Sequence, residues 1–483
     1  MEQLLKMGAM ELARNIAKKK VSSLEVVDAH IARIEAVNPK INAVVAQRFE
    51  QARAEAKAAG EAVVADAKLP PLHGVPFTVK DTFALTGMPH TAGTVHRKDH
   101  IAQQDATAVA RLRAAGAIPL GVTNVPELAM WFETYNQVYG RTCNPYGLDH
   151  IVGGSSGGEA AIIAAGGSPF GIGSDVGGSI RMPAFFCGIF GHKPTGGAVP
   201  MTGHYPRASG AAGRYNVAGP MARRAKDLMP LLRIMAGSDD QDESVIDLEW
   251  DEPKSVGFKN RRILVCHDIN AKLAVGTNQE MRTAVERAAL ALSGKGGAVE
   301  SWSSPRLREA VFIWSAMLSQ AGGPSFGELM GQGKSPSYAF ELLRSAFGAS
   351  KHTFPAIVLA LMEELFGRQG EQEMRRLVQL GVELRQELEE ALGDDAILIM
   401  PTHPRQAPKH NVPLLRPFDF IFTGILNVLE LPCTAVPMGL GPGMVPLGVQ
   451  IVAGHGKDHM TIAAAQFLEK NNGGWAIPVR SLM

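Results

Sequence analysis

Cysteine is scarce in this chain of 483 residues, and no C-x-x-C pair occurs. The four cysteines lie far apart, at Cys143, Cys187, Cys266 and Cys433. This spacing argues against a disulfide framework, a zinc knuckle and a redox motif. It is typical of a protein kept in a reducing compartment, and we expect the protein in the cytoplasm.

An excess of charge of one sign is also missing, because 48 Lys and Arg residues are balanced by 47 Asp and Glu residues. The net charge of +1 would attract neither nucleic acid nor an anionic membrane, so the expected partner is a small molecule. Long apolar runs are absent from residues 1–20, where charged side chains interrupt every stretch before it reaches the length of a membrane span. We therefore expect no membrane span.

Cofactor and metal motifs are missing as well. Neither G-x-G-x-x-G after a strand nor G-x-x-x-x-G-K-[ST] is present in the glycine-rich stretch 153–183, which argues against a phosphate-binding loop. His455 and His459 have the i, i+4 spacing of a metal pair, but flanking glycines interrupt the helix that this spacing requires. We expect surface histidines there, and a protein that needs neither metal nor cofactor.

The residues that are present predict a layered α/β fold. Hydrophobic residues make up 46% of the chain, enough to bury a sizeable core. Short β-prone runs alternate with alanine-rich helical runs after residue 70, which favours sheet and helix layers. The clearest predicted strands are 75–79, 118–122, 396–400 and 447–452. The clearest predicted helix of this region covers 106–115.

Two helices are predicted before this region. Ser22 and Glu25 have capping-box spacing, and apolar residues then recur every three or four positions until Asn38 and Pro39, where the helix should end. A second helix is predicted over 47–59, with Gly60 as its end.

The glycine-rich stretch 153–183 is the most informative part of the chain. Glycine at this density indicates backbone that turns tightly or approaches a ligand closely. One interpretation is a nucleophile elbow, since the sequence around Ser155 satisfies G-x-S-x-G. An elbow also needs an acid and a histidine downstream; His192 or His403 could serve, although nothing marks either one.

Another interpretation explains both Gly/Ser clusters together. The stretch resembles the signature of the amidase-signature family, a G-G-S-S-G-G turn followed by G-S-D-x-G-G-S-I-R-x-P, with Ser155 and Ser179 24 residues apart. Upstream, residues 73–81 (HGVPFTVKD) resemble the family segment that supplies a catalytic lysine, here Lys80. Three separated motifs occur in the family's order.

The resemblance covers about residues 70–235 and 396–455, and the run GSIRMPAFFCGIFGHKPT is most similar to fatty-acid amide hydrolases, especially the second type found in animals. It implies an α/β/α sandwich around a mixed, mostly parallel twisted sheet. One domain is then expected over 1–483, in four parts: N-terminal helices (1–68), the signature core (69–237), a helical insertion (238–395) and the C-terminal part of the core (396–483).

The resemblance also implies the site residues. Ser179 would attack the amide carbonyl, and Ser155, preceded by a cis peptide bond, would pass its proton to Lys80. The oxyanion hole would be formed by the N–H groups of Val176, Gly177, Gly178 and Ser179. The supporting residues would be Ser156, Asp175 and Arg181. No histidine is expected to be essential.

Chemistry places one demand on Lys80. A serine hydroxyl is a poor nucleophile until a base removes its proton, and lysine is a base only when neutral. The pKa of a free lysine, ~10.4, must therefore fall by about 2 to 3 units, which burial achieves. The apolar strand 75–79 that leads into Lys80 should bury it; the alternative is a surface turn where Lys80 pairs with Asp81.

The substrate is expected to be an amide with a hydrophobic acyl or aryl group. Met130, Trp131 and Phe132 occupy the position that lines the acyl channel in the resembling hydrolases, and large apolar residues of the insertion could extend it: Trp314, Met317, Phe347 and Phe354. The alternative is that these side chains simply pack in the core.

Other functions remain open at this point. An amidotransferase-type subunit would use the same signature inside a complex and release ammonia for a partner's substrate. A G-x-S-x-G esterase and a non-enzymatic binding module are the further alternatives. The sequence leaves open the natural amide, the preference over esters or carbamates, whether the insertion covers the site, and the oligomeric state, a homo-oligomer included.

Overall fold

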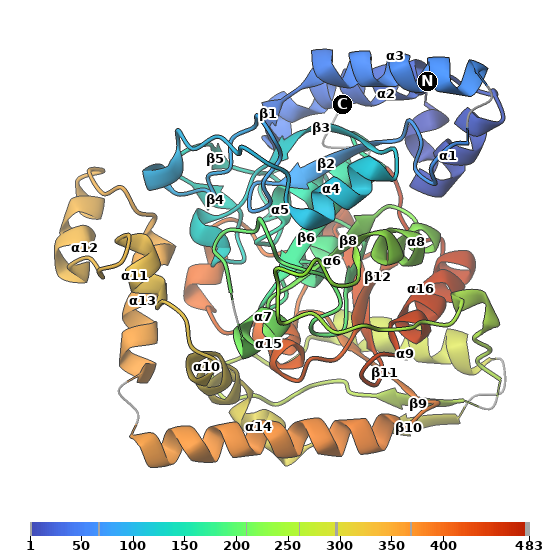
Figure 1. Cartoon of the computed structure of the whole chain (residues 1–483). Helices are drawn as coiled ribbons and strands as arrows, with labels where there is room; N and C mark the ends of the chain where they lie inside the picture. Colours follow the sequence, from blue (N-terminus) through green and yellow to red (C-terminus); the bar gives the residue numbers. More distant parts are fainter. Residues whose placement is uncertain are drawn as a thin grey trace.

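The computed structural model describes residues 2–65, 68–208, 210–259, 261–294, 298–367 and 370–478, so the last five residues of the predicted C-terminal part lie outside it. Its centre is an 11-stranded sheet with the order β1-β3-β2-β6-β8-β7-β12-β13-β11-β9-β10 (Figure 1). Strands from the beginning, middle and end of the chain therefore share one sheet.

The strands and helices have the following bounds. The strands are β1 (Val44–Gln47), β2 (Pro76–Lys80), β3 (Ile118–Thr123), β4 (Tyr135–Asn136), β5 (Gly140–Arg141), β6 (Phe170–Asp175), β7 (Phe190–Lys193), β8 (Val217–Ala222), β9 (Arg262–Val265), β10 (Ala298–Ser301), β11 (Ile397–Pro401), β12 (Cys433–Leu440) and β13 (Pro446–Val452). The helices are α1 (Ala9–Ala17), α2 (Ser23–Ile41), α3 (Phe49–Val64), α4 (Thr107–Ala114), α5 (Gly157–Ala164), α6 (Arg181–Phe186), α7 (Ala211–Tyr215), α8 (Ala225–Met235), α9 (Gln279–Ser293), α10 (Ala310–Gln320), α11 (Phe326–Met330), α12 (Tyr338–Ala346), α13 (Phe354–Gly367), α14 (Glu371–Leu392), α15 (Ile421–Val428) and α16 (Asp458–Asn472).

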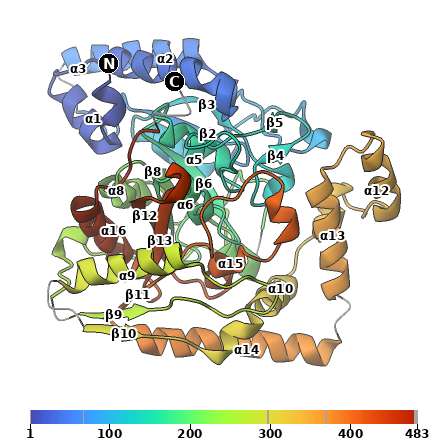
Figure 2. The ribbon, with the colours of Figure 1, turned by 180° about the vertical axis from the view of Figure 1, so that it is seen from behind.

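The sheet is mixed. Parallel pairs lie toward its two ends, where β2 pairs with β3 and β6, and β9 pairs with β10 and β11. Antiparallel pairs connect the middle, from β6 through β8, β7, β12 and β13 to β11. Helices α4, α8, α9 and α16 pack on one face, and α5 and α6 lie on the other, with α2 against α5 (Figure 2). The predicted α/β fold around a mixed sheet is confirmed.

Most predicted elements are found within a residue or two of their expected bounds, among them β2, β3, β11, β13 and α4. The capping box of Ser22 and Glu25 is present. The helix α2, however, continues through Pro39 to Ile41 and ends where Asn42 adopts a left-handed conformation. Near its end, the side chain of Asn38 accepts hydrogen bonds from the N–H groups of residues 43 and 44 and so holds the turn that follows.

Helix α3 also passes its predicted end, because Gly60 lies inside it. A glycine within a helix costs only about 1 kcal/mol relative to alanine. The additional turn places Val63 in the core, where it is 8% exposed, and burial of its side chain offsets that cost.

The segment 238–395 was expected to be a helical insertion, but its first part belongs to the sheet: β9 and β10 extend the sheet and α9 packs on its face. The helical part proper is 305–392, from which α11, α12 and α13 project to one side, with α12 farthest out (Figure 1). Within the described residues, no helix is both long and apolar enough to cross a membrane.

Candidate active site

The site begins where two parallel strands end side by side. Lys80 is the last residue of β2 and Asp175 the last residue of β6, and these strands pair in parallel with Val79 opposite Ile172. Parallel strands bring their carboxyl ends to the same edge of a sheet, which is where ligands bind in open α/β folds. The side chain of Lys80 is fully buried, so the alternative of a surface turn is wrong.

Lys80 contacts two serines. Its Nζ lies 2.8 Å from Ser155 Oγ, 2.9 Å from Ser174 Oγ and 3.3 Å from the carbonyl oxygen of Ser174. Burial lowers the pKa of Lys80 to about 7, although the charges of Asp175 and Glu159 act in the opposite direction. A lysine in this environment is substantially neutral near physiological pH, as a general base must be.

Ser155 lies in a tight turn before α5. The Gly154–Ser155 peptide bond is cis, as the family resemblance implied. A Cβ atom at Gly154 would lie 2.4 Å from the carbonyl oxygen of Trp131, so only glycine allows the turn to approach that segment. The next residue, Ser156, donates its N–H to the carbonyl of Ser179 at 3.1 Å and thus connects the two serine turns.

Ser179 follows β6 in a loop whose backbone is held from outside. Four successive carbonyls, those of residues 175–178, each accept a hydrogen bond, the first three from distant segments and the fourth from the start of α6. The donors are Asn427 Nδ2 to Asp175 O at 2.8 Å, Trp314 Nε1 to Val176 O at 3.1 Å, Thr423 Oγ1 to Gly177 O at 2.8 Å and Met182 N to Gly178 O at 2.7 Å. The N–H of a trans peptide unit points opposite to its C=O. These bonds therefore also fix the N–H directions of residues 176–179.

One predicted oxyanion donor is already in use. The N–H of Gly178 donates to Asp175 Oδ1 at 2.6 Å, whereas Val176 and Ser179 line the cavity described below. Gly178 has φ of +119°, and a Cβ atom there would lie 2.0 Å from Thr423 Oγ1, so glycine is required for the path of the loop. The structure thus corrects the role of Gly178 from an oxyanion donor to the turn that positions its neighbours.

Asp175 and Arg181 form a fully buried pair that supports this loop. Arg181 Nη2 lies 3.0 Å from Asp175 Oδ1, and Arg181 Nε lies 3.1 Å from Asp175 Oδ2. Further bonds from Arg181 reach Asn427 Oδ1 at 2.6 Å and Gln450 Oε1 at 3.0 Å. Burial alone would raise the pKa of Asp175, but the Arg181 charge and the hydrogen bonds hold it well below its usual range.

A cavity of about 930 Å³ opens in front of the serines. Ser155, Ser174, Val176 and Ser179 line its inner end, and the apolar residues of its wall include Met130, Trp131, Val311, Phe312, Trp314, Phe326, Leu329, Leu359, Met374, Phe418 and Phe420. The predicted substrate residues Met130 and Trp131 belong to the wall. Phe132 does not: it is 5% exposed, packs in the main core and stacks at a tilt on Trp131 with 4.8 Å between ring centroids.

The insertion contributes to the cavity, but through other residues than expected. Of the four predicted, Trp314 lines the wall. Met317 packs in the second core cluster, Phe347 is 80% exposed and Phe354 lines a neighbouring cavity of about 420 Å³. Alternate sides of α10 face core and cavity, so apolar character alone did not distinguish Trp314 from Met317.

The two histidines considered for a nucleophile elbow have partners elsewhere. His192 lies in β7 and bonds Thr434 Oγ1 at 2.9 Å and Asp458 Oδ1 at 3.1 Å. His403 bonds the carbonyl of Arg405 at 2.8 Å. Among the described residues, the basic group that reaches Ser155 is Lys80, which favours the Ser-Ser-Lys arrangement over a Ser-His one.

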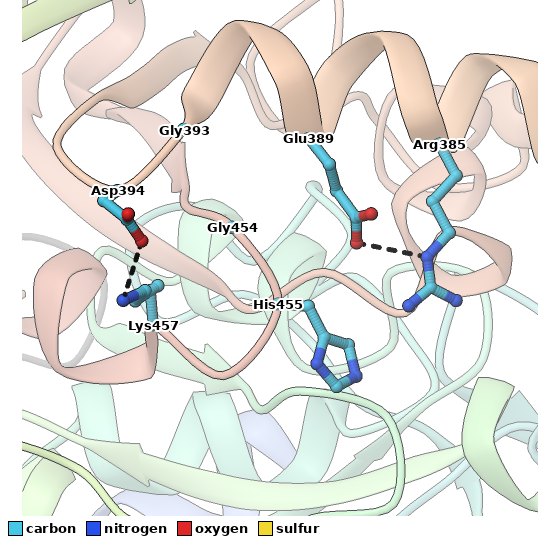
Figure 3. A pocket seen from close by; sticks show the side chains of 7 residues that line it. All are labelled: Arg385, Glu389, Gly393, Asp394, Gly454, His455 and Lys457. Carbon is cyan, nitrogen blue, oxygen red and sulfur yellow. Dashed lines mark hydrogen bonds and ion pairs between the residues drawn. The ribbon is translucent and has the colours of Figure 1, made fainter.

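His455 lies in a different place, beside a polar cavity of about 390 Å³ near the end of α14. Arg385 pairs there with Glu389 at 3.2 Å, and Lys457 pairs with Asp394 at 3.2 Å (Figure 3). Lys80, Ser155 and Ser179 do not line this polar cavity. In the part of the chain that the structure describes, no group of three or more His, Cys, Asp or Glu side chains could hold a metal ion.

Sequence reasoning missed two residues at the inner end of the cavity. Ser174 stands in the signature directly before Asp175, so its position was a usable signal. His204 gave none, because it lies in a loop far from the motifs, yet its Nε2 is 2.9 Å from Ser174 Oγ.

Three comparisons bear on this geometry. Residues 25–462 match the sequence profile of the protein family described as Amidase. The chain is similar to fatty-acid amide hydrolase 2 of Homo sapiens, with 44% identity over 492 residues that cover 99% of this chain and 91% of that protein.

The more distant relatives include one component of the glutamyl-tRNA(Gln) amidotransferase of Roseiflexus castenholzii (strain DSM 13941 / HLO8), 33% identical over 467 residues that cover 94% of this chain and 93% of that protein. Among solved structures, 6-aminohexanoate cyclic dimer hydrolase complexed with substrate superposes with a TM-score of 0.83 at 26% identity, covering 99% of this chain and all of that one (100%).

Proposed function

The chain belongs to the amidase-signature family and is an amide-hydrolysing enzyme. From that premise we propose the roles of its catalytic residues and the class of its substrates. Ser179 is the nucleophile, Ser155 the relay and Lys80 the base. The observation that carries this assignment is the 2.8 Å contact between Lys80 Nζ and Ser155 Oγ in a buried pocket whose cavity also holds Ser179.

We assign the proton path from the Lys80–Ser155 contact and from the cavity that Ser155 and Ser179 share. Neutral Lys80 accepts the proton of Ser155, and Ser155 takes the proton of Ser179 as Ser179 Oγ bonds to the amide carbonyl carbon. The same proton returns through Ser155 to the amine nitrogen as the C–N bond breaks, which leaves an acyl-enzyme on Ser179. Water then attacks the ester along the same path in reverse, and the carboxylic acid leaves.

The backbone of the 176–179 loop stabilises the charge that develops on the carbonyl oxygen. Its N–H directions are fixed before substrate arrives, and preorganised donors of this kind are each worth about 2.7 to 4 kcal/mol in the transition state. Because the N–H of Gly178 is bound to Asp175, the donors we assign are those of Val176, Gly177 and Ser179.

We assign amides with a hydrophobic acyl or aryl group as the substrates. The wall of the cavity beyond the serines is mostly aromatic and aliphatic, and each methylene buried there contributes about 0.8 kcal/mol. The similarity to a fatty-acid amide hydrolase supports this class. The amidotransferase relatives support a second candidate, release of ammonia from a small amide inside a complex.

Covalent labelling tests the assignment. A fluorophosphonate probe should modify the purified chain at Ser179, located by mass spectrometry, and Ser179→Ala should abolish both labelling and hydrolysis of a decanoyl p-nitroanilide. Ser168→Ala, a buried serine just before β6 whose hydroxyl bonds the carbonyl of Phe170, is the matched control and should label normally. Label on Ser155 or Ser156 would contradict the assignment. Absence of anilide hydrolysis by the chain alone, with normal labelling, would favour the amidotransferase alternative.

A further inference from the structure

His204 lies at the inner end of the cavity and shares the hydroxyl of Ser174 with Lys80. It is 6% exposed, and its ring packs edge-on against Phe83 with 4.8 Å between centroids. Nδ1 is 2.8 Å from the carbonyl oxygen of Pro206, and Nε2 is 2.9 Å from Ser174 Oγ. Burial, together with the charge of Lys80, lowers the pKa of His204 to about 3, so the ring is neutral under working conditions.

These contacts determine which ring nitrogen carries the proton. A carbonyl oxygen can only accept a hydrogen bond, so Nδ1 must be the donor toward Pro206. In a neutral imidazole the other nitrogen is then an acceptor. The group that meets Nε2 is the hydroxyl of Ser174, which must donate its proton to His204.

The direction of that bond determines what Ser174 offers to Lys80. With its proton given to His204, Ser174 Oγ has only lone pairs for Lys80 Nζ at 2.9 Å, and the carbonyl of Ser174 at 3.3 Å is also an acceptor. A neutral amine has two N–H groups and one lone pair. Both N–H groups are directed to Ser174, and the lone pair is left for the hydroxyl of Ser155 at 2.8 Å.

We propose that His204 is a positioning residue for the proton relay: by accepting from Ser174, it keeps the lone pair of Lys80 directed at Ser155. Without that acceptor the hydroxyl of Ser174 turns and donates to the same lone pair, in competition with Ser155. The inference rests on the base role proposed for Lys80, and it adds a residue that acts on the base through one intervening hydroxyl.

The charged groups around this relay do not perform the same task. Glu159 accepts from Thr78 and Thr123, and burial raises its pKa to about 8. Asp175 is paired with Arg181. His90 lies near enough to act on the pKa of His204, but it bonds the carbonyl of Thr82 at 3.0 Å rather than Ser174. His90 is therefore a control for a buried, neutral histidine nearby.

The test is a double-mutant cycle on His204 and Ser174. His204→Phe keeps a ring against Phe83 but removes the acceptor, and we expect kcat to fall about 10- to 100-fold with KM changed less than about twofold. The rising limb of kcat against pH should move to lower pH, because a hydrogen bond donated to the lone pair favours the neutral amine. His204→Gln, which offers a carbonyl oxygen in place of Nε2, should restore part of the rate. His90→Phe should leave kcat unchanged.

In a Ser174→Ala background the competing hydroxyl is gone, so adding His204→Phe should cost no further activity. An equal loss in both backgrounds, or a His204→Phe enzyme with wild-type kcat, would overturn the proposal. Lys80→Met is measured beside these variants: if it stays active, the base assignment itself has failed, whereas an inactive Lys80→Met with an unaffected His204→Phe refutes only the role of His204.

Discussion

The cavity has two walls that are built differently. The core wall is defined as the lining residues Ser155, Ser174 and Ser179 together with Lys80, which contacts two of them. Every one of these side chains is at least nine-tenths buried, and the Asp175–Arg181 ion pair is fully enclosed. On the insertion wall, made by α10, α11 and α13, most of the residues that line the cavity are apolar, and Glu328, Glu363 and Glu364 line it as well. The neighbouring α12 and the residue that follows it expose Phe340, Leu343 and Phe347 to 57%, 57% and 80%.

The difference reflects what each wall must do. Proton transfer requires donors and acceptors held at fixed distances, which only a buried and fully bonded arrangement provides. Binding an apolar chain requires surface and shape, which side chains of several kinds supply. Changes to the core wall should therefore cost far more than changes to the insertion wall, and the expected effects can be ranked.

The largest effect is expected at Lys80. Lys80→Met keeps most of the side-chain volume but removes the base, and kcat/KM for a decanoyl anilide should fall by about 10⁴ or more. In the wild type, activity requires the neutral amine, so kcat/KM should rise with pH through the lysine pKa of about 7 and level off above it. Steady-state rates from mildly acidic to mildly alkaline pH test both; a profile that falls across that range would contradict the lysine base.

The next effect is on stability and compares ion pairs from the two regions. Arg181→Met leaves Asp175 buried without its partner, and the free energy of unfolding should drop by about 3 to 5 kcal/mol. Arg376→Met on α14 breaks a half-exposed pair with Glu373, which solvent screens, and should leave the free energy of unfolding almost unchanged. Urea unfolding followed by circular dichroism measures the free energy of unfolding of both variants. Equal losses in the two variants would contradict the view that the core wall depends more strongly on its ion pair than the insertion does.

Trp314 sharpens the comparison because it belongs to the insertion yet bonds the catalytic loop. Trp314→Phe keeps an aromatic ring beside Phe420 but loses the bond to Val176 O. We expect kcat to fall about five- to tenfold, equivalent to roughly 1 to 1.4 kcal/mol, with little change in the dependence on acyl length. Trp302→Phe, outside the cavity lining, is the control; an unchanged kcat for Trp314→Phe would show that the loop holds itself.

A smaller effect should appear at Trp131. For p-nitroanilides from acetyl to decanoyl, kcat/KM of the wild type should climb with chain length until the cavity is full. Trp131→Ala should flatten that climb by a few-fold at the long end while acetyl anilide is hydrolysed as before. A flat wild-type series, or a variant with the same slope as the wild type, would end the acyl-channel assignment.

The smallest effect is expected just after α12. Phe347→Ser replaces a side chain that is 80% exposed, so both kcat/KM and the free energy of unfolding should stay within experimental error, about 0.5 kcal/mol for the latter. A pronounced loss of activity on a long-chain substrate would show that the outer face of the insertion takes part in binding.

The sequence alone determined the chemistry that depends on local pattern. Three motifs in order predicted Lys80, Ser155 and Ser179 as site residues, and apolar runs predicted the strand that carries Lys80, because strand periodicity and turn glycines are properties of neighbouring residues. The structure places Lys80 against Ser155, with Ser179 in the same cavity. The same reasoning assigned too many residues to the site. The N–H of Gly178 is bonded to Asp175, and the ring of Phe132 packs in the core. Local sequence pattern does not show which other residues bind the same N–H group or pack against the same ring.

Only the tertiary structure decided which distant groups meet. The assignment of β9 and β10 to the sheet, the choice of Trp314 rather than Met317 for the cavity, and the contact of His204 with Ser174 all depend on how the chain packs. A hydrogen bond has a direction that its next neighbours impose, so the tautomer of His204 follows from Pro206 and the lone pair of Lys80 follows from His204. These hydrogen bonds join segments that are far apart in the chain, so the order of residues in the sequence does not indicate them.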